Sequence, residues 1–249
     1  MQKFYLVPIL FLLVLWGVDS HSQTVAVATN MKPAFEEIYQ GFKQSHPESI
    51  RIVYGSSGNL ATQIRQGAPF HLFIAADEVY PLRLYQDGKA LSQGVVYAIG
   101  HLVLLLNVKG DPKSSDPLDP TASLLKSASK ISIANPELAP YGAAAVRYLK
   151  THKLWDLAKD RLVFGENISI ATMYVSSGAV DVGFTSLSLA QSSEVAKTSR
   201  YINLDGKDTL ISQRMVLIKG APKVVMSLYD YLQSPAAKSI LIKHGYSTP

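Results

Sequence analysis

The 249-residue chain contains no cysteine. This absence excludes disulfides, zinc–thiolate sites, cysteine nucleophiles and a cysteine-linked lipid anchor. Charged residues make up only 17% of the chain, and its Lys and Arg residues are scattered rather than clustered. A net charge of +5 without a basic cluster does not indicate a nucleic-acid surface. We therefore expect no nucleic-acid partner.

Long hydrophobic runs are missing beyond the N-terminus. The mostly apolar run from Phe4 to Val18 follows a short positive start that includes Lys3. This pattern is typical of a secretory signal peptide, which we place at residues 1–22. The run is short for a membrane span and contains Pro8. Because export without disulfides fits a bacterial periplasm, we expect the mature chain to be a soluble periplasmic monomer.

Patterns that would bind a metal cation are also lacking. The six histidines show no metal-ligand spacing, and the thirteen tyrosines include no adjacent pair with carboxylates that would suggest an iron site. We therefore expect no direct ligands for a metal cation and no cofactor.

Short apolar strands alternate with amphipathic helices along the rest of the chain. The expected strands cover residues 24–28, 50–54, 72–75, 98–107, 130–134, 161–164, 180–184 and 209–218. Several of them are β-branched and apolar without strict alternation, which is typical of strands buried on both faces. Strands alternating with helices predict an α/β fold with a mostly parallel sheet and right-handed crossovers.

Two of these strands, near residues 98–107 and 209–218, are suited to carry the chain between two lobes. We expect a discontinuous first lobe of residues 23–99 and 214–249, and a second lobe of residues 100–213. Each lobe is predicted to be a mixed, mostly parallel sheet flanked by helices, with these two strands as hinges and the ligand in the cleft between the lobes.

The first strand ends in a polar turn, Thr29-Asn30, and an amphipathic helix follows. We expect Asn30 to cap this helix and Pro33 to occupy its first turn. The turn then offers backbone N–H groups, a threonine hydroxyl and an asparagine amide to an anion. For a single turn of this kind, a merely well-capped helix is the favoured explanation.

Three further strands end in turns of the same kind. Ser56 and Ser57 follow the second strand, Tyr141 opens a later helix, and Asn167 is the expected N-cap of another, next to the backbone N–H of Ile168. Ligands of such sheets bind beyond the carboxyl ends of the strands. The four turns therefore predict one site built of neutral donors, which suits a compact, fully ionised oxyanion.

The choice of ligand and of activity is left open by this pattern. A protonated phosphate would need a carboxylate acceptor, and we expect the nearby Glu137 and Glu166 to be exposed. Sulfate, phosphate and a small organic anion remain alternatives. Residues 55–59 nearly match the hydrolase motif G-x-S-x-G, but Asn59 replaces the last glycine and no histidine partner is indicated. An exported hydrolase using Ser56 or Ser57 is the alternative from another class.

Several segments together resemble a known family. They are Ala28-Thr-Asn30, Tyr54-Gly-Ser-Ser-Gly-Asn-Leu60, Gly67-Ala-Pro-Phe-His-Leu-Phe-Ile-Ala-Ala-Asp77, Asn135-Pro136 through Pro140-Tyr-Gly142, and Ser234-Pro-Ala-Ala-Lys with the closing His-Gly-Tyr246. Over essentially its whole mature length, the chain resembles the periplasmic molybdate-binding proteins of ABC transporters. The resemblance implies a two-lobed, type II periplasmic binding protein fold without catalytic activity. It also implies molybdate or tungstate as ligand and an inner-membrane permease as partner.

The same resemblance implies which residues bind the oxyanion. They are Thr29, Asn30, Ser57, Tyr141 and the backbone of Ile168, with Ser56, Asn167 and Ser186 as additional candidates.

The chain departs from the family pattern at three positions. Many members have serine in place of Asn30, and aspartate in place of His71. Many also have a tyrosine two residues beyond the glycine at Gly183, where this chain continues Phe-Thr-Ser186. These departures affect the expected selectivity rather than the class of anion, and His71 is expected to affect lobe packing.

Overall fold

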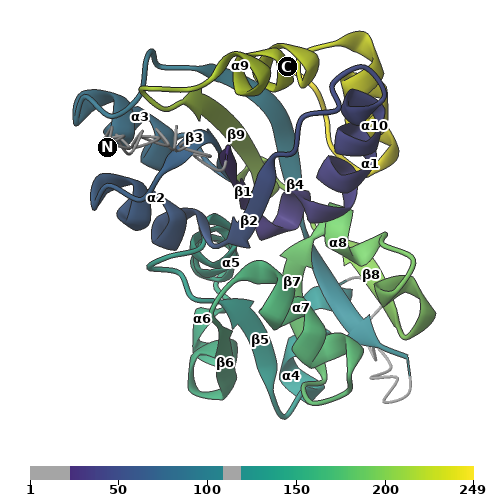
Figure 1. Ribbon diagram of the computed structural model, residues 1–249. Helices are drawn as coiled ribbons and strands as arrows, with labels where there is room; N and C mark the ends of the chain where they lie inside the picture. The colour runs from purple at the N-terminus through teal and green to yellow at the C-terminus, as the bar shows by residue number, and fades with distance from the viewer. Residues whose placement is uncertain (1–22, 109–118) are drawn as a thin grey trace, which may run out of the picture.

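The structure is a computed structural model that describes residues 23–108 and 119–249. The expected signal peptide, residues 1–22, lies outside the described residues. Helices flank an open mixed sheet, as the α/β prediction required (Figure 1). Among the described residues, no helix is long and apolar enough to cross a membrane.

The strands are β1 (Thr24–Ala28), β2 (Arg51–Gly55), β3 (Phe70–Ile74), β4 (Val95–Asn107), β5 (Ile131–Ala134), β6 (Leu162–Gly165), β7 (Val182–Ser186), β8 (Ser199–Asn203) and β9 (Leu210–Leu217). The α-helices are α1 (Lys32–Lys43), α2 (Ser57–Arg65), α3 (Val79–Gln86), α4 (Pro120–Ser127), α5 (Pro140–Thr151), α6 (Trp155–Ala158), α7 (Ile168–Ser176), α8 (Leu187–Ala190), α9 (Lys223–Tyr231) and α10 (Pro235–Lys243). Short 3₁₀ turns are η1 (Thr29–Met31), η2 (Lys159–Arg161), η3 (Val195–Lys197) and η4 (Lys207–Thr209).

The strands follow the order β2-β1-β3-β9-β4-β7-β5-β6, and β8 pairs with β4. The long strand β4 serves two parts of this sheet. Its first part, up to His101, pairs antiparallel with β9, whereas its second part, from Leu102, pairs antiparallel with β7 and β8. We call β2, β1, β3, β9 and the first part of β4 the first half-sheet, and the second part of β4 with β7, β8, β5 and β6 the second half-sheet.

Figure 1 shows the first half-sheet and its helices in the upper part of the molecule, and the second half-sheet below it. The predicted lobe boundaries, 99/100 and 213/214, fall within β4 and β9. The division into lobes at these positions stays a prediction.

The apolar sequence of β1 explains why this strand is buried. All five of its residues are buried; Val25 and Val27 belong to one core cluster and Ala26 to another. Side chains on successive strand residues point to opposite faces, so β1 is covered on both sides. Helices α1, α9 and α10 cover the first of these faces, and α2 and α3 cover the second. A further cluster of buried side chains lies between the second half-sheet and helices α4 and α5.

Strands β1, β2 and β3 are parallel, as are β5, β6 and β7. Their carboxyl ends are therefore close together within each half-sheet, which positions the turns that follow them. β8 (Ser199–Asn203) is not predicted by the sequence, because three of its five residues are polar and only Ser199 is buried. Pairing with β4, far away in the sequence, explains this strand.

Candidate functional site

The turns after four predicted strands meet in one cavity. Its lining residues are Ala28, Thr29, Asn30, Gly55, Ser56, Ser57, Ala76, Ala139, Pro140, Tyr141 and Ile168. They follow β1, β2 and β3 in the first half-sheet, and begin α5 and α7 beside the second half-sheet. The structure thus brings together Thr29, Asn30, Ser57, Tyr141 and Ile168, together with Ser56. The cavity is a feature of the junction between the two half-sheets.

The cavity is narrow and its lining is neutral. Its volume is about 10 Å³, which is about the room that one water needs. No charged residue is among the described residues that line it. Glu137 and Glu166 are exposed, as expected, and neither lines the cavity. A narrow neutral cavity rich in donors suits a small, compact anion rather than an extended organic one.

The first turn differs from its prediction. Thr29, Asn30 and Met31 form the 3₁₀ turn η1, and α1 begins after it without a side-chain cap. The expected N-cap role of Asn30 is therefore wrong. Both hydrogens of its side-chain amide are used inside the protein, because Nδ2 donates to Gln213 Oε1 at 3.0 Å and to Tyr246 OH at 2.9 Å.

Asn30 Oδ1 is buried and has no hydrogen-bond partner among the described residues. An amide oxygen only accepts hydrogen bonds, so it cannot bind a fully ionised oxyanion. The amide donor expected from the sequence is therefore not available to an oxyanion.

The second turn supplies two serine hydroxyls at the start of α2. Ser57 Oγ accepts a hydrogen bond from the backbone N–H of Ala76 at 2.9 Å, which leaves its own proton available to a ligand. Ser56 Oγ is buried and has no hydrogen-bond partner among the described residues. Because Ser57 is the first residue of α2, its backbone N–H has no partner within the helix. The turn therefore presents several unused donors at one point.

Neither serine has the partner that a hydrolase requires. Within the described part of the chain, the backbone N–H of Ala76 is the one hydrogen-bond partner of Ser57 Oγ, and Ser56 Oγ has none. A serine nucleophile needs a histidine within hydrogen-bond reach. The geometry therefore contradicts the hydrolase alternative.

Tyr141 reaches the cavity from the first turn of α5 and is almost fully buried. Its hydroxyl accepts a hydrogen bond from Gln213 Nε2 at 3.0 Å. Burial raises the pKa of Tyr141 well above its usual value, so the phenol keeps its proton near neutral pH. Tyr141 can therefore act as a neutral donor.

The fourth turn begins α7. Asn167 caps this helix through Oδ1, which accepts from the backbone N–H of Ile170 at 3.1 Å, as predicted. Thr29 Oγ1 lies 3.5 Å from the same oxygen, a long and weak contact. The backbone N–H of Ile168, the first residue of α7, has no partner within the helix. Asn167 thus positions the helix end and does not itself line the cavity.

Ser186, the last of the sequence candidates, and His71, which was expected to affect lobe packing, lie outside the cavity. Ser186 is buried at the end of β7, where its Oγ caps α8 by accepting from Leu189 N at 3.2 Å. His71 Nδ1 accepts from the backbone N–H of Thr24 at 3.3 Å, a contact within the first half-sheet. Neither residue reaches the four turns directly.

The two half-sheets touch beside the cavity. The backbone N–H of Gly58 donates to Leu138 O at 2.8 Å, and Tyr80 OH donates to Glu137 O at 3.0 Å. A Cβ atom at Gly58 would lie 2.8 Å from Leu138 O and 2.7 Å from Tyr80 OH. Glycine is therefore required for this close approach.

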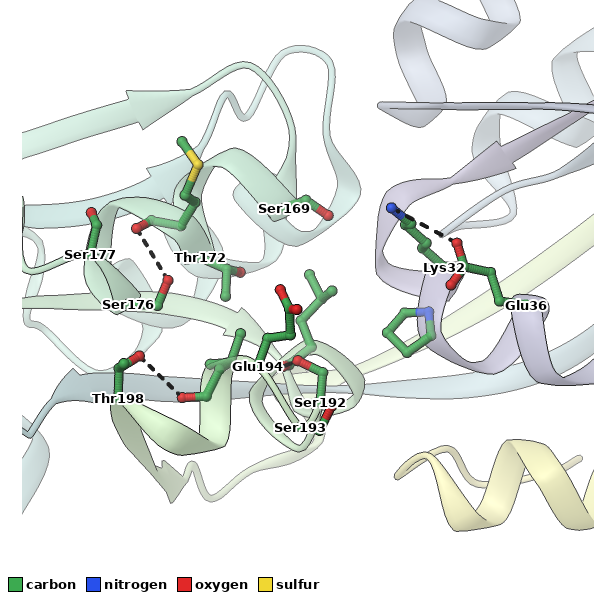
Figure 2. A pocket seen from close by; sticks show the side chains of 14 residues that line it. Lys32, Glu36, Ser169, Thr172, Ser176, Ser177, Ser192, Ser193, Glu194 and Thr198 are labelled. Atoms are coloured by element: carbon green, nitrogen blue, oxygen red, sulfur yellow. Dashed lines mark hydrogen bonds and ion pairs between the residues drawn. The ribbon is translucent and has the colours of Figure 1, made fainter.

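A larger groove of about 660 Å³ lies between α1 and the segment from α7 to η3. In Figure 2, Lys32 and Glu36 lie on one side of the groove, and Glu194 lies with several serines and threonines on the other. The hydroxyls of Ser176 and Ser192, for example, donate to carbonyls of their own helical turns. With two carboxylates and one ammonium among its lining residues, the groove suits an oxyanion poorly.

Sequence reasoning missed three residues that support the cavity: Tyr97, Gln213 and Tyr246. Tyr97 OH lies 2.9 Å from both Ala75 O and Gln213 Oε1, so its single proton is shared between these acceptors. Tyr246 OH donates to Asn30 O at 2.9 Å. No local pattern marks these residues, because their partners lie far away in the chain. Tyr246 belongs to the closing His-Gly-Tyr segment of the family resemblance, which does not indicate this role.

The sequence of the chain is similar to those of known proteins. Residues 23–247 match the family described as bacterial extracellular solute-binding protein. The chain is 34% identical to the molybdate-binding protein ModA of Azotobacter vinelandii over 227 residues, which cover 89% of this chain and 88% of that protein. It is 30% identical to the putative ABC transporter substrate-binding lipoprotein YvgL of Bacillus subtilis, over 90% of this chain and 85% of that protein.

The fold of the chain is also similar to that of a solved molybdate-binding protein. The solved structure of the Azotobacter vinelandii periplasmic molybdate-binding protein superposes with a TM-score of 0.80 at 28% identity. The superposition covers 92% of this chain and 100% of that one.

Proposed function

We propose that this chain, which belongs to the bacterial extracellular solute-binding protein family, binds molybdate or tungstate at the four turns. The resemblance seen in the sequence is confirmed by relatives named as molybdate-binding proteins. The family is one of binding proteins, and the chain has a binding function rather than a catalytic one. The observation that carries the proposal is the narrow, uncharged cavity in which neutral donors converge.

The available donors fit a tetrahedral oxyanion. Ser56, Ser57 and Tyr141 each have a hydroxyl proton that no described residue accepts, and Thr29 gives its own only to a weak contact. Backbone N–H groups at the starts of α2 and α7 add to them. Each hydrogen bond to a charged acceptor contributes roughly 1.5–3 kcal/mol, so several of them offset the loss of the ion's hydration.

We propose that selectivity depends on the size of the cage when it holds the ion, which must be wider than the cavity of about 10 Å³ in the structure. Molybdate and tungstate are larger tetrahedra than sulfate, so donors spaced for them fit sulfate less well. A protonated phosphate gains no carboxylate partner among the described residues, because none of the residues that line the cavity carries a carboxylate. The position of Asn30 tunes this fit through the backbone of η1, since its side-chain amide is tied to Gln213 and Tyr246.

Capture requires the two half-sheets to part and close. Donors come from both of them, and we propose that β4 and β9 act as the hinge between lobes of residues 23–99 with 214–249 and residues 100–213. The bond from Gly58 N to Leu138 O belongs to the closed arrangement. Closure removes water from the bound ion.

Delivery to a transporter completes the proposal. The Bacillus relative is named as a substrate-binding component of an ABC transporter. We infer that this chain is exported to the periplasm through a signal peptide at residues 1–22, works as a monomer, and hands the oxyanion to an inner-membrane permease.

Isothermal titration calorimetry of the mature chain tests the function. Molybdate and tungstate should bind one per chain with micromolar or lower Kd, and sulfate and phosphate at least about 100-fold more weakly. Tightest binding of sulfate or phosphate, or the absence of binding by all four ions, would overturn the proposal.

A further inference from the structure

The side chain of Gln213 is completely buried in β9 and connects the two half-sheets. Its Oε1 accepts from Asn30 Nδ2 at 3.0 Å and lies 2.9 Å from Tyr97 OH. Its Nε2 donates to Tyr141 OH at 3.0 Å. A single amide therefore joins a residue of the first turn, a residue of β4 and a residue that begins α5.

The three buried tyrosines near this amide differ in where their protons go. Tyr246 OH donates to Asn30 O and accepts from Asn30 Nδ2, so both roles are filled inside the protein. Tyr97 gives its proton to Ala75 O or Gln213 Oε1. Tyr141 OH accepts from Gln213, and within the described part of the chain no group accepts its proton.

We propose that Gln213 is a positioning residue that determines the specificity of the site by directing the Tyr141 proton toward the ligand. The inference rests on the proposed oxyanion function. Because Gln213 Nε2 can only donate, the Tyr141 hydroxyl must receive that bond with a lone pair and keep its proton for a second acceptor. The hydroxyl is thereby set to donate to a ligand oxygen that carries no hydrogen, and this disfavours a protonated oxyanion.

The strand next to Gln213 leaves space for this contact. Gly100 lies in β4, and a Cβ atom there would be 2.1 Å from both Gln213 Nε2 and Tyr141 OH. Any other residue at this position would force the amide and the phenol apart. The close approach of the two groups thus depends on a glycine in the middle of β4.

A double-mutant cycle measured by calorimetry with molybdate tests the role of Gln213. Gln213→Met keeps the length of the side chain and removes the donor, and should weaken binding about 10-fold. In a Tyr141→Phe background the same substitution should change the Kd less than about 3-fold, because its effect passes through the missing hydroxyl. Equal losses in both backgrounds would overturn the inference.

Gln213→Glu supplies a readout that a purely steric role would not give. A carboxylate at this position accepts the Tyr141 proton instead of donating to the phenol, and adds negative charge near the ion. At pH 8 this variant should bind molybdate at least as weakly as Gln213→Met, although glutamate resembles glutamine more closely in shape. Tighter binding by Gln213→Glu than by Gln213→Met would contradict the proposal.

Two further variants keep the test interpretable. Gln233→Met removes the hydrogen bond that Gln233 Nε2 donates to Tyr229 O outside the cavity. This variant should leave the Kd unchanged within about 2-fold. Gly100→Ala should weaken molybdate binding about 10-fold or more while both Gln213 and Tyr141 remain present. Wild-type affinity in Gly100→Ala would count against the inference. Failure of the wild-type chain to bind any tetrahedral oxyanion would instead refute the proposed function.

Discussion

Ser57 Oγ accepts a hydrogen bond from the backbone N–H of Ala76 at 2.9 Å. This contact joins the turn after β2 to the turn after β3. In it, the Ser57 hydroxyl acts as an acceptor and does not use its own proton. The proton of Ser57 is then free for a ligand. Tyr141 is held in a comparable way, since its hydroxyl accepts a hydrogen bond from the side chain of Gln213 in β9.

Replacing Ser57 with alanine should weaken molybdate binding about 10- to 100-fold, because one hydrogen bond to a charged ligand is lost. The variant should also lose about 1–3 kcal/mol of unfolding free energy, since the N–H of Ala76 is left buried without a partner. Calorimetry and urea denaturation measure the two effects. Ser127→Ala, remote from the cavity, is the control; an unchanged Kd in Ser57→Ala would remove this serine from the site.

Replacing Gly58 with alanine should weaken binding about 10-fold or more while leaving the ligand-free protein folded. The added Cβ would collide with Leu138 O and Tyr80 OH, so the half-sheets could not approach fully. Alanine is otherwise favourable inside a helix such as α2. Small-angle scattering with molybdate should show less compaction than in the wild type.

Gly41→Ala is the matched control for this effect. Its Cβ would meet only the tip of the Tyr231 side chain within the first half-sheet. Binding should therefore stay near the wild-type value. Equal affinity in Gly58→Ala and the wild type would show that the contact with Leu138 is not required for capture.

The carboxyl group of Asp77 makes the stability of the folded protein depend on pH. Burial, together with the nearby Glu78, raises its pKa to about 6, against the lowering effect of the hydrogen bond from Tyr80 N. A raised carboxyl pKa means that folding favours the protonated form of Asp77. The stability that this preference contributes is fully present below the unfolded pKa of 3.8 and is lost as the pH rises through about 6.

Wild-type unfolding free energy, relative to Asp77→Asn, should therefore fall by up to about 3 kcal/mol between pH 4 and pH 7. Urea denaturation over this range measures the difference. The exposed Asp230→Asn is the control and should follow the wild type. Parallel curves for the wild type and Asp77→Asn would exclude a raised pKa at Asp77.

Tyr246 supports the first turn from the C-terminal end of the chain. Replacing it with phenylalanine removes the bond to Asn30 O and the acceptor for Asn30 Nδ2. We expect the Kd for molybdate to rise about 3- to 10-fold and the unfolding free energy to fall by about 1–2 kcal/mol. Tyr231→Phe, at a tyrosine whose hydroxyl has no hydrogen bond among the described residues, should change neither value. The same result for Tyr246→Phe would show that this support is not needed.

Local sequence patterns predicted the parts of the site that are built locally. Each turn follows a strand and begins a helix, so Thr29, Ser57, Tyr141 and Ile168 could be identified from their neighbours in the chain. Their convergence follows from parallel strands whose carboxyl ends meet. The same reasoning could not find Gln213, because its three partners are contributed by distant elements.

The role of Asn30 shows how a local rule can fail. Asparagine before an amphipathic helix is typical of an N-cap, yet the chain makes the 3₁₀ turn η1 there. The amide turns inward because Gln213 and Tyr246 offer buried acceptors that a sequence window does not contain. Long-range hydrogen bonds thus overrode the helix-capping preference.

The location of the bound ion tests the account most directly. Crystals of the mature chain with molybdate, measured at the molybdenum absorption edge, should show one strong anomalous peak within hydrogen-bond distance of Thr29, Ser57, Tyr141 and the backbone N–H of Ile168. A peak in the groove between α1 and α7 instead, or no ordered molybdenum at the four turns, would contradict the account.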